Sequence, residues 1–213
     1  MRLVGTRAPQ LPVAPPEYGQ QERDKYSNIL RLYFNTVDTT FANLLNGDGA
    51  GGKYLLFPYA AIQRTTDATF TANTATQITF DQNDYLNGCA NDGTDGITVS
   101  QPGIYNYQFS VQLKNTDTQI HSAWIWLRKN GTDVPSTASK FDVISSHGGT
   151  PGYILAACNF FVDLEADDTV EMWAAVGNVA ITFDAIAAQT VPFAMPAIPS
   201  VVATLSFVSN LAS

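Results

Sequence analysis

The sequence predicts a mainly β protein, in which a proline-rich arm and one long helix precede an antiparallel sandwich or barrel. Only 14% of the 213 residues are charged, whereas 9 are tyrosine and 12 are phenylalanine, and aromatic residues favour strands. Short apolar segments separated by turn dipeptides recur after residue 52, with no helical segment between them. An all-β segment of this size most commonly forms a jelly roll.

The first element, residues 1–16, is expected to be an extended anchoring arm. Four prolines fall between residues 5 and 16, and each proline fixes φ and lacks the N–H that a ladder hydrogen bond needs. Such a segment cannot bury its own apolar side chains, so it is either disordered or bound along another protein. Leu11 and Val13 are apolar anchors that favour a bound partner.

The second element, residues 17–46, has the spacing of an amphipathic helix and carries acidic residues near its start. One apolar stripe contains Tyr26, Ile29, Leu30, Tyr33, Phe34, Val37, Phe41, Leu44 and Leu45. The helix could pack on its own head, or it could be a self-associating stem or a docking helix. The glycine-rich linker at 47–53 favours a stem or docking helix, and the bulky aromatics favour a trimeric or docked arrangement over a two-stranded one.

The remaining residues, 54–213, are expected to form a β head of about eight to ten strands. The candidate strands are residues 54–64, 74–81, 97–100, 103–115, 120–129, 143–145, 153–164, 169–175, 180–187 and 201–208. Turn dipeptides such as Asn87-Gly88 and Asn130-Gly131 separate them. Because no β-α-β alternation is present, dinucleotide-binding and P-loop folds are excluded.

Two strands show how their faces are used. In residues 105–113 every odd position is apolar and every even one is polar, which predicts one buried face and one solvated face. In residues 123–127 both faces are apolar, with Trp124 and Trp126 on one side and Ile125 and Leu127 on the other. The tryptophan face is expected in the core or against another subunit, with a sugar-stacking platform as the alternative.

The charge distribution limits the partners that can be expected. The formal net charge of −8 lies in residues 51–213, which hold six basic and fourteen acidic residues. An acidic surface disfavours nucleic acid and anionic membranes, because both bind basic residues. No apolar run approaches the ~18–20 residues of a membrane span, and the start lacks a signal-peptide core, so neither membrane insertion nor export is expected.

Few residues suggest chemistry. Asp92 and Asp95 could hold a Ca²⁺ ion, although Asp-Gly pairs more often simply form tight turns. Cys89 and Cys158 fit no metal-ligand or redox spacing, and whether they pair is left open. We expect no metal site otherwise, no cofactor and no enzyme activity, because no nucleophile, base and orienting acid occur together.

Three short motifs resemble the complement C1q and tumour necrosis factor domain over about residues 60–210. The residues that carry the resemblance are Pro102-Gly103-Ile104-Tyr105, Lys129-Asn130-Gly131 and the segment from Leu164 to Val170. Asp167 stands where that family has glycine, and residues 201–208 replace its closing aromatic-x-Gly strand. The resemblance implies a ten-stranded jelly roll and a compact homotrimer, whose interface is expected at Tyr105, Tyr107, Trp124, Trp126 and Phe207.

The N-terminal residues resemble the start of virion proteins of podoviruses that infect marine bacteria, through Pro16-Glu17-Tyr18 and residues 28–35. This implies a bacteriophage structural protein located in the virion and assembled in the host cytoplasm. Residues 1–50 would bind other virion proteins, and the trimeric head would serve as a fibre or decoration for stabilisation or for attachment to a host-surface glycan or protein. The alternative is a secreted or surface C1q-like lectin, which the missing signal peptide argues against.

Overall fold

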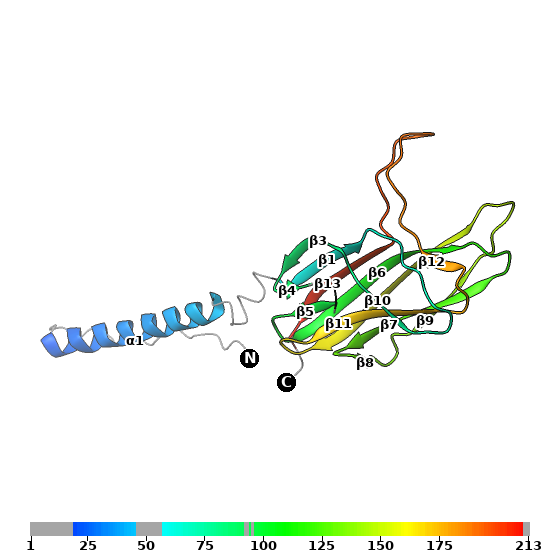
Figure 1. Cartoon of the computed structure of the whole chain (residues 1–213). Helices are drawn as coiled ribbons and strands as arrows, with labels where there is room; N and C mark the ends of the chain where they lie inside the picture. The colour runs from blue at the N-terminus through cyan, green and yellow to red at the C-terminus, as the bar shows by residue number, and fades with distance from the viewer. Residues whose placement is uncertain (1–18, 46–56, 92–93, 95, 211–213) are drawn as a thin grey trace. The chain divides into compact units, whose positions relative to one another are not determined.

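The computed structural model describes residues 19–45, 57–91, 94 and 96–210 of the chain. The chain divides into two compact units, Met1–Leu56 and Phe57–Ser213. The described part of the first unit is one helix, and that of the second unit is a pair of antiparallel sheets (Figure 1). The predicted mainly β class with a single preceding helix is therefore confirmed for the described residues.

Helix α1 spans Gln20–Leu45, within the predicted range of 17–46. Five residues of the predicted stripe are partly buried: Tyr26, Ile29, Leu30, Tyr33 and Val37. Phe34 and Phe41 are more than half exposed, as is Leu32 on the opposite side of the helix. The arm at 1–16 with Leu11 and Val13, the linker at 47–53 and the side chain of Leu44 lie outside the described residues.

The second unit contains two sheets, A and B, in which every strand pairing is antiparallel. Sheet A has the order β10-β6-β13-β1-β3, with β12 also paired to β6, and contains β1 (Tyr59–Arg64), β3 (Gln82–Asn87), β6 (Gly103–Asn115), β10 (Gly152–Leu164), β12 (Ile181–Phe183) and β13 (Val201–Ser209). Sheet B has the order β4-β5-β11-β7-β8, with β2 paired to β11 and β9 to β7, and contains β2 (Thr76–Ile78), β4 (Cys89–Ala90), β5 (Ile97–Val99), β7 (His121–Lys129), β8 (Thr132–Asp133), β9 (Ser139–Val143) and β11 (Thr169–Val176).

Most predicted strands are present, but some have other bounds and three strands were not predicted. The predicted strand at 143–145 is wrong, because β9 occupies Ser139–Val143 instead. Strands β3, β4 and β8 were not predicted, because most of their side chains are exposed and they lack the apolar alternation of a half-buried strand. The predicted strand at 180–187 is shortened to Ile181–Phe183.

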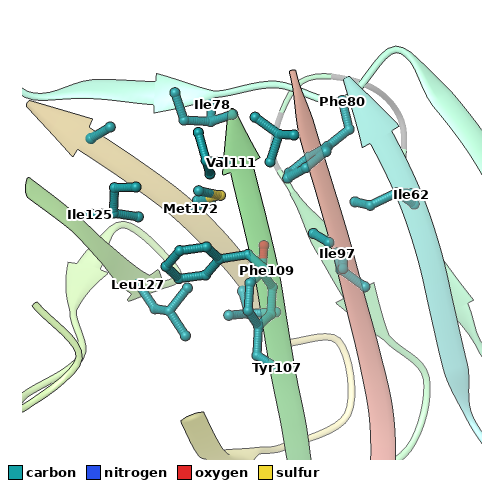
Figure 2. Packing of buried hydrophobic residues seen from close by; sticks show 14 of the residues in the cluster. Ile62, Ile78, Phe80, Ile97, Tyr107, Phe109, Val111, Ile125, Leu127 and Met172 are labelled. Atoms are coloured by element: carbon teal, nitrogen blue, oxygen red, sulfur yellow. The ribbon is translucent and has the colours of Figure 1, made fainter. Parts of the chain in front are cut away.

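The core lies between the two sheets, and β6 supplies its centre. The odd-numbered side chains of β6 face inward and are buried: Tyr105, Tyr107, Phe109, Val111 and Leu113. Ile125, Leu127 and Met172 from sheet B belong to the same core (Figure 2). The alternation predicted for residues 105–113 is therefore confirmed.

Three residues expected at a trimer interface are instead part of this core. Tyr105 and Tyr107 have no exposed surface, and Phe207 retains only 5%. The Phe207 ring packs edge-on against Tyr105, with ring centres 5.6 Å apart, and over Gly103, where a Cβ would overlap the ring. The expectation is wrong for these residues, because their inward parity leaves no side-chain surface for a neighbouring copy.

The two core tyrosines provide a matched test of this packing. Tyr105→Phe is expected to lower the free energy of unfolding by about 1 kcal/mol, because the Tyr105 hydroxyl donates to the Gln101 carbonyl at 2.7 Å. Tyr107→Phe is expected to leave the free energy of unfolding unchanged or to raise it, since the buried Tyr107 hydroxyl has no hydrogen-bond partner among the described residues. Urea unfolding at one protein concentration measures both, and equal losses of stability in the two variants would contradict the assignment.

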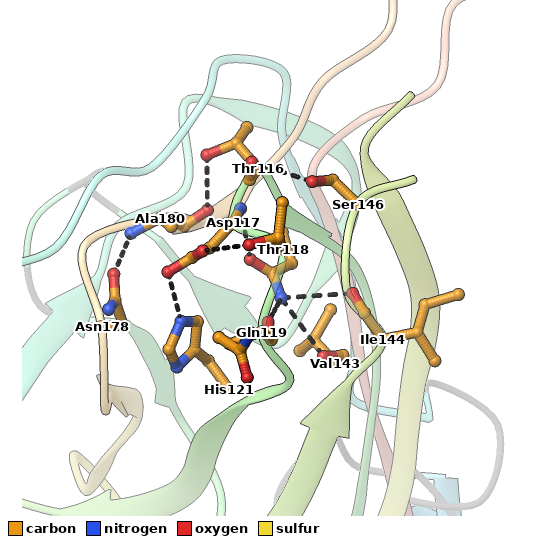
Figure 3. A network of polar contacts seen from close by, with 11 residues as sticks. Thr116, Asp117, Thr118, Gln119, His121, Val143, Ile144, Ser146, Asn178 and Ala180 are labelled. Carbon is orange, nitrogen blue, oxygen red and sulfur yellow. Dashed lines mark hydrogen bonds and ion pairs between the residues drawn. The ribbon is translucent and has the colours of Figure 1, made fainter. Parts of the chain in front are cut away.

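A polar network closes one end of the sandwich (Figure 3). The buried Asn115 amide at the end of β6 donates to the carbonyls of Gln119 at 2.8 Å, Val143 at 3.3 Å and Ile144 at 3.2 Å. Its carbonyl oxygen accepts from the Asp117 amide at 2.9 Å. One side chain therefore ties the β6–β7 turn to the segment that follows β9.

Asp117 extends the network toward β7. His121 contacts the Asp117 carboxylate at 2.8 Å, and this hydrogen bond lowers the pKa of Asp117. Ser146 and Thr116 add further links, because the Ser146 hydroxyl donates to the Thr116 carbonyl at 3.1 Å. The network satisfies backbone groups in the turns and fixes where β7 begins.

Candidate functional site

The outer face of sheet A is the surface that points away from the core. Strand register places the following side chains on this face, which we call the sheet A outer face: Tyr59, Ala61, Tyr85, Asn106, Gln108, Ser110, Gln112, Lys114, Tyr153, Leu155, Ala157, Asn159, Phe161, Asp163, Val202, Thr204 and Ser206. Leu155 and Phe161 are 60% and 65% exposed. Large exposed apolar side chains on a single sheet face mark an interaction surface.

The centre of the sheet A outer face is hollowed. Small and polar side chains of β6, β10 and β13 surround an open hollow of about 520 Å³, namely Gln108, Ser110, Ala157, Asn159, Val202 and Thr204, with Phe109 and Cys158 also lining it. Leu155 and Phe161 lie two and four residues from Ala157 on the same side of β10. The face therefore combines a recess with projecting apolar side chains.

Charged side chains on the sheet A outer face lie at its margins. Lys114 and Asp184 form an ion pair at 2.8 Å, and the Tyr153 hydroxyl donates to the same carboxylate at 2.9 Å. The hydrogen bond to Asp184 raises the pKa of Lys114. Asp163 lies at the far end of β10, next to Ile104 of β6. Among the described residues that line the hollow, none is charged, although the chain has a net charge of −8.

All three tryptophans of the chain lie on the outer face of sheet B. Trp124 and Trp126 point outward from β7, while Ile125 and Leu127 are fully buried, so the predicted division of faces is confirmed. Trp173 of β11 lies directly opposite Trp126. Contact between Trp124 or Trp126 and another subunit stays a prediction.

The polar groups on the outer face of sheet B already have partners within the chain. The Arg128 guanidinium stacks 3.8 Å from the Trp173 ring centre, and its Nε donates to Asp133 at 2.6 Å. Trp126 Nε1 donates to the same carboxylate at 2.8 Å, and these two bonds lower the pKa of Asp133. Trp173 Nε1 donates to Glu171 at 2.7 Å. This face is charged and internally paired, unlike the centre of the sheet A outer face.

Two of the short motifs noted in the sequence meet where the β7–β8 turn contacts the β10–β11 turn. Asn130 donates from its side-chain amide to Asp168 at 2.6 Å and accepts from the Thr169 amide at 2.8 Å. Burial raises the pKa of Asp168, but hydrogen bonds from Glu165 and Asn130 and the charge of Lys129 outweigh it and leave the pKa lowered. Asp167 has φ of 68°, a left-handed conformation that glycine adopts most readily.

Among the described residues, neither a metal site nor a disulfide is formed. Asp92 and Asp95 lie outside the described residues. In the described part of the chain, no group of three or more His, Cys, Asp or Glu side chains could hold a metal ion. Cys89 and Cys158 are both unpaired thiols, and burial raises the pKa of Cys89 to about 12. No described helix is long and apolar enough to cross a membrane.

The comparisons with known proteins add no relative: no family model matches the chain, and no curated protein matches it.

The sheet A outer face was not predicted as an interaction surface, although the sequence contains a pattern that indicates it. In residues 153–161 both parities contain large apolar side chains, with Ile154 and Phe160 on one side and Leu155 and Phe161 on the other. This is the same two-sided pattern that singled out residues 123–127. The pattern identifies a strand covered on both sides, but it does not say which distant residues share its outer face.

Proposed function

We propose that the chain is a structural attachment protein of a bacteriophage particle. Three copies assemble through C1q-like jelly-roll heads, and residues 1–50 anchor the trimer to other virion proteins. The head then stabilises the particle or contacts the host surface. The observation that carries the proposal is the uncharged centre of the sheet A outer face, beside exposed Leu155 and Phe161, on a strongly acidic chain.

The strand order supports a jelly roll. Eight strands in chain order, β1, β5, β6, β7, β9, β10, β11 and β13, divide between the sheets as β1-β13-β6-β10 and β5-β11-β7-β9. In this order the first strand pairs with the eighth and the third with the sixth, while the second pairs with the seventh and the fourth with the fifth. This pairing pattern supports a jelly roll, because it is the one expected when two Greek keys wrap into a double sheet.

The charge pattern supports self-association through the sheet A outer face. Residues 51–213 hold six basic and fourteen acidic residues, so two heads repel one another through most of their surface. An uncharged centre with exposed Leu155 and Phe161 lets apolar surface be buried without enclosing unpaired carboxylates. Side chains that project beside a recess also allow copies of one surface to interdigitate.

The division of the chain supports a separate anchoring role for residues 1–50. Helix α1 belongs to a different compact unit from the head and exposes apolar Leu32, Phe34 and Phe41. Residues 1–50 hold five basic and five acidic residues, so this part is neutral while the head is acidic. Two parts with different surfaces are suited to different partners, and residues 28–35 carry the resemblance to virion proteins.

The proposal is tested by mass and by location. Light scattering of the full chain is expected to give three times the 23.0 kDa of one copy, and a monomeric mass would contradict the trimer. Peptides of the chain are expected in mass spectra of purified particles of the phage that encodes it. A fluorescent protein fused to residues 1–50 is expected to bind those particles, whereas the same protein fused to residues 51–213 serves as the control. If neither the chain nor the fusion of residues 1–50 is found on the particles, the anchoring role is contradicted.

One observation favours the lectin alternative. Trp124 is 36% exposed on the outer face of sheet B and lies along β7 beside Trp126. An exposed aromatic face can stack on a sugar ring while neighbouring polar groups bind its hydroxyls. Glycan-array binding that is lost in Trp124→Ala and retained in Phe161→Ser would support this alternative, and no binding at all would exclude it.

A further inference from the structure

One strand of sheet A is interrupted by a long insertion. Strands β12 and β13 run along the same side of β6, with Phe183 opposite Leu113 and Val201 opposite Val111. Only Gln112 lies between these two positions on β6. Seventeen residues, 184–200, therefore face the single residue Gln112, which is an insertion of sixteen residues into one continuous strand.

Both ends of the insertion bind Gln112. The Asp184 amide donates to the Gln112 carbonyl at 2.9 Å, and the Gln112 amide donates to the Ser200 carbonyl at 2.9 Å. In a regular antiparallel pair, one opposing residue makes both of these bonds. Asp184 and Ser200 thus act together as that one residue, and the ladder of sheet A closes without residues 185–199.

Residues 185–200, which we call the finger, form an ordered ribbon beyond the sheet. Figure 1 shows it as the orange pair of segments that extends from the junction of β12 and β13, away from β7, β8 and β9 of sheet B. Bridges join Ile186 to Ile198 and Gln189 to Met195, with backbone hydrogen bonds of 2.8–3.1 Å. Near its far end Val191 and Phe193 are 79% and 61% exposed.

The composition of the finger is unusual for an exposed segment. It contains no charged residue in a chain of net charge −8, and its side chains are largely alanine, proline, isoleucine, valine, phenylalanine and methionine. A two-stranded ribbon alone in water is at best marginally stable. An exposed apolar ribbon that the sandwich does not need for closure is the mark of a contact with another molecule.

We propose that the finger binds the sheet A outer face of a neighbouring copy of the chain, so that it clasps the adjacent head in the trimer. This inference rests on the proposed function. The finger is rooted in sheet A and extends away from sheet B, so a copy that docks on the sheet A outer face lies beside it. From residue 185 to residue 191 a strand reaches about 20 Å, enough to cross from the edge of a sheet onto an adjacent surface.

Charge and shape favour a second copy as the occupant. The finger and the hollow of the sheet A outer face both lack charged side chains, whereas the heads are acidic elsewhere. The hollow of about 520 Å³ is lined by side chains such as Ser110, Ala157 and Thr204, which leave room for a projecting apolar group. Val191 and Phe193 are such groups, and burying them removes apolar surface from water.

The strand register allows a deletion variant that keeps the pairing of sheet A with β6. Removing residues 185–200 joins Asp184 to Val201 and leaves Phe183, Asp184 and Val201 opposite Leu113, Gln112 and Val111. Asp184 then keeps its outward position beside Lys114. Because the deletion also removes hydrogen bonds of Ser200 to Arg64 and Thr66, the double variant Val191→Ser/Phe193→Ser tests the same contact with the chain length unchanged.

Sedimentation velocity over a dilution series of the full chain is the measurement. The concentration at which the trimer dissociates is expected to rise at least tenfold in both variants, with far-ultraviolet circular dichroism unchanged. The control is Val179→Ser, which replaces an apolar side chain of similar exposure at the β11–β12 turn with a polar one. It is expected to leave the dissociation concentration of the trimer unchanged. A monomeric wild-type chain would overturn the proposed trimer. If the wild type is a trimer and both variants dissociate at the same concentration as the wild type, only the role of the finger is overturned.

A crosslinking experiment locates the contact. With p-benzoylphenylalanine in place of Phe193, irradiation of mixed ¹⁵N-labelled and unlabelled copies is expected to join the finger to β6, β10 or β13 of another copy. Crosslinks confined to one chain, or to sheet B of another copy, would overturn the proposal.

Discussion

Phe161→Asp is expected to convert the trimer into monomers, raising the concentration at which it dissociates at least a hundredfold. Phe161 is 65% exposed on β10 and carries part of the apolar surface of the sheet A outer face. The substitution would enclose a carboxylate in the interface, and an unpaired charge removed from water costs several kcal/mol. In a monomer–trimer equilibrium the dissociation constant varies as the square of this concentration, so a hundredfold rise corresponds to about 5.6 kcal/mol per trimer, or about 1.9 kcal/mol for each copy.

Sedimentation equilibrium measures this effect, and the structure provides its controls. Leu155→Asp, on the same side of β10, is expected to act in the same way. Val179→Asp places the same charge on an equally exposed apolar position and is expected to preserve the trimer. If Phe161→Asp stays trimeric and Trp124→Asp does not, the interface lies on the outer face of sheet B instead.

Asn115→Ala is expected to lower the free energy of unfolding by about 3 kcal/mol. The Asn115 side chain is fully buried, donates to three backbone carbonyls and accepts from one amide. Truncation removes all four of these hydrogen bonds, and each ordinary hydrogen bond contributes about 0.5–1.5 kcal/mol to stability. The loss therefore exceeds that of one ordinary hydrogen bond.

Chemical denaturation monitored by tryptophan fluorescence measures this loss. Asn178→Ala is the matched control, because the Asn178 side chain accepts one hydrogen bond, from the Ala180 amide at 2.9 Å. It is expected to lose about 1 kcal/mol or less. Equal losses in the two variants would show that the Asn115 network does not tie the end of the sandwich together.

Local periodicity explains what could be predicted. The strict alternation of residues 105–113 identified the buried and outward faces of β6, and the parity of residues 123–127 placed Ile125 and Leu127 in the core. The same parity places Tyr105 and Tyr107 on the apolar, inward side of β6, so their expected position at an interface was wrong. Strands β3, β4 and β8 escaped prediction because exposed side chains carry no alternation.

The sequence by itself determined the mainly β class, the helix near residues 20–45 and the faces of the long strands, because each depends on residues a few positions apart. Only the tertiary structure decided that Phe161, Ala157 and Thr204 share one outer face with an uncharged hollow. It also decided that Asp184 and Ser200 meet at Gln112, which makes the residues between them a finger rather than a loop of the core. Register between distant strands is set by long-range pairing and core packing, which no local pattern encodes.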